Sequence, residues 1–222
     1  LSEVVKLNSY TQGNQAKPKV ANLKDGNFVA GWESYGQDGS LFGSFGQIFD
    51  PYGTHVGSEF QISNETLGHQ HDPNVVGLNS GNFLVVFENR IGNTSEVIAQ
   101  EFSALGYKIG APISVGESYI GHFTEGEGQF NPELEVLSDG SVAVTWATPS
   151  NGSSDIVSKI IPTKSGIKKA IKKELIFIKG NLASTSKYIS GNEKIELFQS
   201  EDTASFKRLE LDIEVLFEDD YL

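Results

Sequence analysis

The hydrophobic positions of this chain fall into short runs that are separated by turn-forming residues. In the first part of the chain, four such runs cover about residues 19–23, 27–34, 43–50 and 58–62. The gaps between them hold pairs such as Asp25-Gly26 and Asp38-Gly39, which are typical of tight hairpin turns because glycine accepts positive φ without steric cost. The pattern therefore predicts four antiparallel strands.

This unit recurs twice more along the chain. Three sets of residues share a repeat position: Gln15, Gln70 and Gln129; Pro18, Pro73 and Pro132; and the aromatic residues Trp32, Phe87 and Trp146. The prolines lie 55 and 59 residues apart. The second half of the unit also recurs, since residues 46–53 match 99–106 and, more weakly, 158–166. Self-similarity at this period indicates a repeat architecture.

Four strands in a unit of about 55 residues is typical of a β-propeller blade. We therefore predict an all-β, β-propeller-like chain of three clear four-stranded blades plus a divergent fourth β unit. Residues 28–32 and 83–87 are almost continuously apolar, as expected for a strand that is covered on both faces. The recurring Trp or Phe is expected to fill the core between blades.

The two ends of the chain depart from the repeat. The expected division is a closing strand at 1–7, repeats at 8–62, 63–115 and 116–179, and a divergent C-terminal β element at 180–222. Within that last part, residues 209–217 alternate between apolar and polar side chains, which predicts a strand with one face in water. Two arrangements are open: a four-bladed ring closed by strands from both ends, or an open row of three units followed by a separate β element.

Composition and charge limit the classes of partner that the chain can bind. The formal net charge of the 222 residues is −12, which disfavours binding to nucleic acid, and no apolar run is long enough to span a membrane. The absence of cysteine excludes disulfides and thiolate metal sites. The chain contains no methionine, even at position 1, so we expect a processed product or a segment of something longer.

Metal-binding candidates are few. His69 and His71 are two residues apart, so on a strand they share a face, and Asp72 could add an oxygen ligand. Calcium is a second option at the acidic turns, which contain Asp25, Asp38, Asp50 and Asp139. These turns lack the dense spacing of a calcium loop, and Asx turns explain them as well. No other cofactor is expected.

The recurring glutamines have two interpretations. Gln15, Gln70 and Gln129 each precede the repeat proline by three residues. They either hydrogen-bond backbone groups between blades or line the mouth of a ligand site, where Trp32 or Tyr35 would stack on a sugar ring. The second interpretation predicts a lectin-like site.

Catalytic motifs are absent from the sequence. No nucleophile elbow, phosphate-binding loop or metalloprotease motif occurs. A glycosidase needs two facing carboxylates, and the repeats place no acidic residue at a shared inward position. We therefore predict that the chain is not an enzyme.

Three sequons occur, at Asn64, Asn93 and Asn151, all in expected turns where a glycan is tolerated. They weakly favour a secretory route and a glycoprotein.

The first unit carries a recognisable motif at residues 13–40, Gly-x-Gln-x-x-Pro-x-Val-Ala-x-Leu-x-Asp-Gly-x-Phe-Val-x-x-Trp-Glu-Ser-x-Gly-Gln-Asp-Gly-Ser. Together with 46–50 and 57–62, it resembles tandem propeller-type repeats of large secreted or surface adhesin-like proteins of bacteria and ciliates. The resemblance extends to residue 178 and fails over 180–222.

The resemblance implies an extracellular or cell-surface role that is structural or adhesive. From the exposed terminal strands we expect, in addition, self-assembly of the chain as a fibre subunit. The expected partners are other copies of the chain or neighbouring repeats, joined through the terminal strands at 1–7 and 209–217. The alternative is a lectin-like carbohydrate-binding propeller with surface glycans as partners.

Overall fold

The computed structural model describes residues 4–121, 130–150, 153–163, 176–178, 181–182, 195–200 and 206–210. These residues form strands and turns and contain no helix, so none of them provides a helix able to cross a membrane. The prediction of an all-β chain is confirmed. The chain divides into two compact units, residues 1–137 with 142–161 and residues 138–141 with 162–222.

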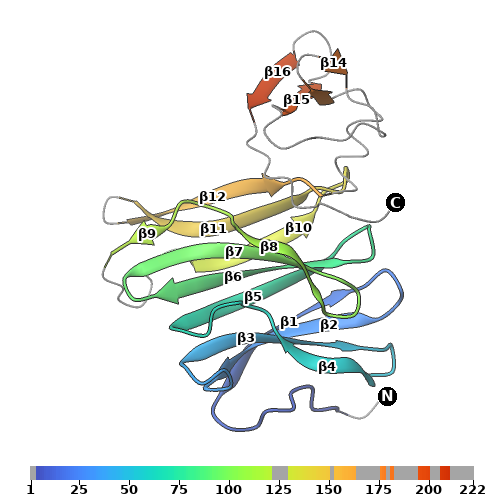
Figure 1. Ribbon diagram of the computed structural model, residues 1–222, viewed down its shortest axis with the longest axis vertical. Coiled ribbons are helices and arrows are strands. Elements are labelled where there is room, and N and C mark those ends of the chain that lie inside the picture. Colours follow the sequence, from blue (N-terminus) through green and yellow to red (C-terminus); the bar gives the residue numbers. More distant parts are fainter. Residues whose placement is uncertain are drawn as a thin grey trace. The chain divides into compact units, whose positions relative to one another are not determined.

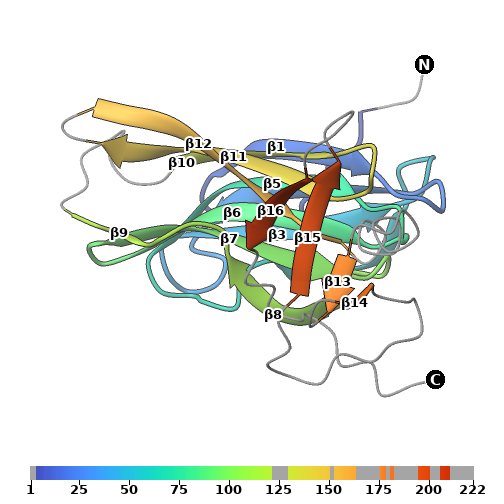
Figure 2. The ribbon, with the colours of Figure 1, turned by 90° about the horizontal axis from the view of Figure 1, so that it is seen from above.

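Unit 1 contains three antiparallel sheets, which follow one another along the chain (Figure 1). The first consists of β1 (Gln15–Asn22), β2 (Phe28–Tyr35), β3 (Phe42–Phe49) and β4 (His55–Gln61). The second consists of β5 (His69–Gly77), β6 (Phe83–Ile91), β7 (Thr94–Phe102) and β8 (Lys108–Ser114), with β9 (Tyr119–Ile120) beside β7. The third consists of β10 (Phe130–Val136), β11 (Val142–Ser150) and β12 (Ser153–Ile161). Figure 2 looks along the stack, in which the sheets overlie one another.

The sheets are held together by alternate side chains of the same strands. On β6, Phe83, Val85 and Phe87 are buried against the first sheet. Leu84 and Val86, which point the opposite way, are buried against the third sheet. This explains the continuous apolar run in the sequence, because β6 is covered on both faces. The recurring aromatic position lies between sheets in the second and third copies, at Phe87 and Trp146, as predicted, whereas Trp32 of the first copy lies on the outer face of the first sheet.

A β-bulge recurs at the start of each sheet. Lys17, Asp72 and Asn131, each just before the repeat proline, have φ values of 52°, 50° and 52°. At the same places the register of the first strand shifts against the second. Bulges of this kind redirect a strand and its side chains. Here they bring the charged side chains at the start of β5 toward the end of β2.

The third sheet departs from the expected four strands. Within the described part of unit 1 it has three, whereas four strands were predicted for each repeat. Instead β13 (Ile176–Ile178) pairs with β14 (Asn181–Leu182) and β15 (Ile195–Ser200) in unit 2, where β16 (Phe206–Glu210) completes a separate sheet. Of the expected strand at 209–217, residues 211–217 lie outside the described residues.

The expected closing strand at 1–7 is not formed over residues 4–7. Leu7 instead packs on the outer face of the first sheet, beside Trp32, Phe45 and Phe49. A strand needs a free backbone edge as its partner, and this face presents side chains. The described residues show stacked sheets, and no closed propeller ring.

Candidate functional site

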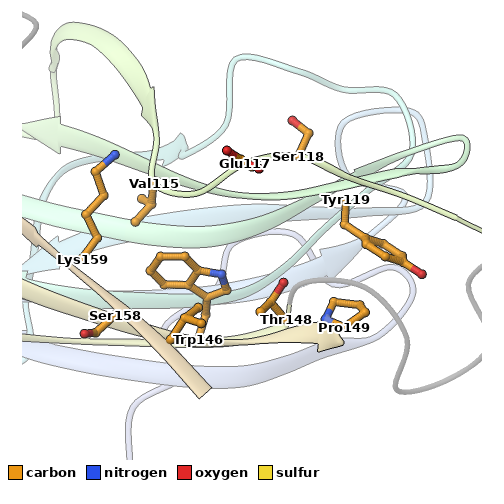
Figure 3. Close-up of a pocket in the computed structure, with 10 residues that line it drawn as sticks. Val115, Glu117, Ser118, Tyr119, Trp146, Thr148, Pro149, Ser158 and Lys159 are labelled. Carbon is orange, nitrogen blue, oxygen red and sulfur yellow. The ribbon is translucent and has the colours of Figure 1, made fainter. Parts of the chain in front are cut away.

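A cavity of about 510 Å³ that is open to solvent lies in unit 1, between the segment that follows β8 and strands β11 and β12 (Figure 3). Its walls mix aromatic, hydroxyl and charged side chains. They are formed by Val115, Glu117, Ser118, Tyr119, Trp146, Thr148, Pro149, Val157, Ser158 and Lys159. Ligand cavities in proteins are commonly of about 300–1,000 Å³ and combine an apolar wall with a few polar groups. This cavity is therefore the candidate site.

Trp146 forms the floor of the cavity. The side chain is only 6% exposed, yet its indole Nε1–H has no hydrogen-bond partner among the described residues. Figure 3 shows the nitrogen edge turned toward the side of the cavity where Thr148 and Tyr119 lie. A buried N–H without an acceptor is costly and most such groups are satisfied. The indole thus offers a donor to a molecule in the cavity.

In the described residues, the third sheet lacks a contact that the other two sheets have, at a position that borders the cavity. In the first sheet, Gln47 Nε2 donates to the carbonyls of Ile48 and Val56, which ties β3 to β4. In the second sheet, Gln100 Nε2 donates to the carbonyls of Glu101 and Ile109, which ties β7 to β8.

The register of β12 on β11 places Lys159 at this repeat position in the third sheet. With no fourth strand in the described part of unit 1, the inner face of β12 is left open to the cavity.

The charged groups of the cavity differ in their surroundings. Glu117 and Tyr119 are each engaged with another part of the chain. The Lys159 side chain is exposed, and its ammonium group makes no hydrogen bond or ion pair within the described part of the chain. The cavity therefore offers an unpaired cation and an unpaired indole N–H.

The recurring glutamines have an internal role in the structure. Gln15 Nε2 donates to the carbonyl of Gln12 at 2.9 Å, and Gln70 Nε2 donates to the carbonyl of Leu67 at 2.9 Å. Each amide also reaches a residue of the second strand, Ser34 or Asn89. These side-chain contacts fix the loop that enters the first sheet and the loop that enters the second, so they are local and do not join one sheet to the next. Gln129 lies outside the described residues.

The two aromatic residues predicted to stack on a sugar are placed differently from each other. Trp32 is buried on the outer face of the first sheet with Phe45 and Phe49, so its ring is not open to a ligand. Tyr35 is 44% exposed and packs edge-on against Phe42, with 5.1 Å between ring centroids. The structure does not bring Tyr35 to the cavity.

The predicted metal residues lie in an ion-pair network around Glu33. His71 Nδ1 is 3.2 Å from Glu33 Oε1, and the Asp72 carboxylate is 2.7 Å from Lys17 Nζ. His69 stacks on His71, with 4.7 Å between ring centroids. Among the described residues, no group of three or more His, Asp or Glu side chains is arranged to hold a metal ion.

Within this network the two imidazoles and the carboxylate influence one another. Burial would raise the pKa of Glu33, but hydrogen bonds from His71 and from the Asp72 backbone, with the charges of His71 and Lys17, hold it below its ordinary value. Burial lowers the pKa of His69, and the nearby His71 and Arg90 lower it further. The network thus joins the first two sheets.

The acidic turns proposed for calcium adopt Asx-turn geometry. The carboxylates of Asp25, Asp38, Asp50 and Asp139 each accept a hydrogen bond from the backbone N–H two residues ahead. Of the sequons, Asn64 and Asn93 are exposed in turns, and Asn151 lies outside the described residues.

Sequence reasoning missed the cavity residues. One signal was present, because Lys159 stands where the first two repeats have Gln47 and Gln100. When one repeat replaces a residue that has a structural role in the other repeats, that position no longer serves the same role in packing. Trp146 was expected to be core, and its unpaired N–H becomes visible only when its neighbours are known.

Comparison with known proteins relates the chain to others by fold alone. No family model matches it, and no curated protein matches it in sequence. The endo-arabinase from Bacteroides thetaiotaomicron VPI-5482 superposes with a TM-score of 0.50 at 15% identity, covering 96% of this chain and 81% of that one. A protein of unknown function from Dyadobacter fermentans DSM 18053 superposes with a TM-score of 0.48 at 14% identity, covering 89% of this chain and 63% of that one.

The likeness to the endo-arabinase corrects one prediction. We excluded an enzyme because the repeats share no inward acidic residue, and that exclusion is wrong, since a similar β fold forms an enzyme. The physical reason is that an active site needs one set of residues, which a single repeat or a junction between repeats can supply. By its fold, the chain is similar to an endo-arabinase.

Proposed function

We propose that this chain is a carbohydrate-binding protein on a propeller-type scaffold, and that the cavity containing Trp146 is its binding site. The observation that carries the proposal is the buried Trp146 indole N–H, which faces the cavity and has no acceptor among the described residues; the Trp32 N–H has none either, but Trp32 does not line the cavity. Sugars present hydroxyl oxygens that accept such a hydrogen bond and C–H faces that pack on aromatic rings. Tryptophan serves both contacts because it joins a large apolar ring to one polar N–H.

The remaining walls of the cavity suit the same ligand class. Ser118 and Thr148 supply hydroxyl groups that donate or accept, and Tyr119 adds a second aromatic ring. Pro149 and Val157 supply apolar surface. This balance of apolar walls and a few polar groups supports a neutral or singly charged sugar better than a polyphosphate or a metal ion.

The propeller scaffold is supported by the way the sheets stack. The aromatic position faces the preceding sheet in both the second and the third copy, at Phe87 and Trp146. A repeat in which each sheet packs its successor in the same way is the construction principle of a propeller.

The test exploits the two tryptophans, which occupy the same repeat position in different surroundings. Trp32→Phe leaves Trp146 as the sole indole, so its fluorescence reports the cavity while sugars are titrated. Trp146→Phe keeps a ring and removes the N–H. We expect it to weaken sugar binding about fivefold by calorimetry, the value of one neutral hydrogen bond, while Trp32→Phe binds as the wild type does. The proposal is refuted if no sugar in a panel of mono- and oligosaccharides binds, or if Trp146→Phe binds sugar as tightly as the wild type does.

A second candidate function, an extracellular structural and adhesive module, is supported by the far face of the third sheet. Ile156 is 77% exposed, whereas Val97 at the same position of the second sheet is 0% exposed. Ile160 is 47% exposed, whereas Ile48 at its position in the first sheet is 1% exposed. We propose that a sheet of a second copy packs there, by the contacts that already join the sheets of unit 1.

Light scattering coupled to size exclusion tests this assembly. Ile156→Asp should convert an oligomer to a monomer, and Leu105→Asp, at a turn residue that is also well exposed, should leave the oligomer intact. A wild-type protein that stays monomeric at high concentration refutes the assembly proposal.

A further inference from the structure

We infer that the sugar bound in the Trp146 cavity is acidic, a hexuronic acid or a similarly carboxylated residue, and that Lys159 binds its carboxylate. The inference rests on the proposed carbohydrate-binding function and goes beyond it by naming the ligand class. It starts from a difference between the repeats. The position that holds a neutral, fully structural amide in the first two sheets holds a cation in the third.

The glutamine at this position has a structural role in the first two sheets, which Lys159 does not take over in the third. Gln47 and Gln100 are both 1% exposed, and each donates to carbonyls of the neighbouring outer strand. Lys159 is exposed and lines the cavity instead. A lysine at this place is thus free to serve a ligand.

The charge balance inside the cavity favours an anion. Glu117 and Lys159 are the two charged side chains of the lining. Glu117 is already engaged with another part of the chain, whereas Lys159 has no ion-pair or hydrogen-bond partner in the part of the chain that the structure describes. An incoming carboxylate therefore meets an unpaired ammonium group.

The arrangement also fits the shape of one sugar ring with one acidic group. In Figure 3, Lys159 lies on one side of Trp146, and Tyr119 and Thr148 lie on the other. A ring held over Trp146 can direct its carboxylate to Lys159 and its hydroxyls to Thr148 and to the indole N–H. The contact with Lys159 is an ion pair and the contacts on the other side of Trp146 are hydrogen bonds, and this difference would orient the sugar ring.

The net charge of the chain does not explain a preference for acidic sugars. The net charge of −12 repels anions at long range, so an acidic ligand must be selected by a local contact. Because the contact is close to solvent, added salt should weaken it. Salt sensitivity of binding is thus a second signature of the same lysine.

The experiment compares methyl glycosides of glucuronic, galacturonic and mannuronic acid with the matching neutral hexosides, by calorimetry and by Trp146 fluorescence in the Trp32→Phe protein. We expect at least one uronide to bind about fivefold or more tightly than its neutral counterpart, the value of about 1 kcal/mol for an exposed ion pair. Lys159→Gln, which restores the residue of the other two repeats, should remove this preference. Lys6→Gln, at an exposed lysine outside the cavity, should keep it.

The outcomes separate the two proposals. If neutral and acidic sugars bind equally, or if Lys159→Gln keeps the preference, the acidic ligand is refuted and the carbohydrate site stands. If acetate alone binds as tightly as the uronide, the site recognises an adventitious anion and the inference is refuted. If no sugar of either class binds to the wild type, both proposals fail. A thermal melt of Lys159→Gln that matches the wild type excludes unfolding as the cause of a loss.

Discussion

Glu33 is one of the buried charged side chains of unit 1. Its side chain is 3% exposed, and Oε1 lies 2.7 Å from the Asp72 backbone nitrogen, 3.2 Å from His71 Nδ1 and 3.3 Å from Lys17 Nζ. Asp72 and His71 belong to the second sheet, so this one oxygen joins two sheets. We predict that Glu33→Gln destabilises unit 1 because it removes the charge and keeps the shape.

The magnitude follows from the number and kind of contacts. Hydrogen bonds to a charged group stabilise by roughly 1.5–3 kcal/mol and those to a neutral group by about 0.5–1.5 kcal/mol. The amide oxygen of glutamine can still accept from the Asp72 N–H but attracts Lys17 and His71 less strongly. We expect a loss of about 2 kcal/mol, which for a protein of this size lowers Tm by roughly 4–8 °C.

The pH dependence gives an independent signature. The pKa of Glu33 is held below its ordinary value of 4.5, so the folded state binds its proton less readily than the unfolded state does. Its contribution to stability is therefore complete above that ordinary value and is lost as the pH falls through the folded pKa. Between neutral pH and this acidic range, the wild type should lose more stability than Glu33→Gln.

Thermal melts followed by tryptophan fluorescence measure both effects, because Trp32 and Trp146 are both in unit 1. Glu65→Gln is the matched control, since Glu65 is exposed and its change should stay within about 0.5 kcal/mol. If Glu33→Gln melts with the control, or if the two acid profiles run in parallel, the network does not hold the sheets together as argued.

Three further predictions concern packing and are read from the same melts. Gly77→Ala should destabilise unit 1 by about 1–3 kcal/mol, because its Cβ would come within 2.1 Å of the Asn22 carbonyl oxygen. Gly31→Ala makes only ordinary contacts and should be near neutral. If the two variants melt at the same temperature, the close approach of the first two sheets is refuted. Gln100→Leu should cost about 1–3 kcal/mol by orphaning carbonyls of β8, and hydrogen exchange confined to that strand should rise with it. Phe102→Ala should cost about 3–5 kcal/mol, since the ring is fully buried, and a loss below 1 kcal/mol would contradict the packing.

The candidate site shows where sequence reasoning reached its limit. The repeat identified Trp146 as a core position, and the structure does bury it. The sequence offered no reason to separate Trp146 from Trp32, because both occupy one repeat position. They differ only in what surrounds them: Phe45 and Phe49 beside one, an open cavity beside the other.

For the metal candidates, the sequence suggested a site that the structure does not form. His69, His71 and Asp72 look like ligands when only their spacing is known. Their actual partners, Glu33 and Lys17, are 38 and 55 residues away from His71 and Asp72 and come from another sheet. Spacing along one strand cannot reveal such partners, because they depend on how neighbouring sheets stack.

The sequence by itself determined the local structure of this protein. Apolar runs, glycine turns and a period of about 55 residues identify four-stranded units and the side chains that point to each face, because hairpins and strand alternation are set by near neighbours. Tertiary structure alone decided what covers each face. It left the third sheet without a fourth strand in the described part of unit 1, opened a cavity over Trp146, and placed Glu33 between two sheets. These features depend on contacts between distant segments, for which a single sequence carries no local signal.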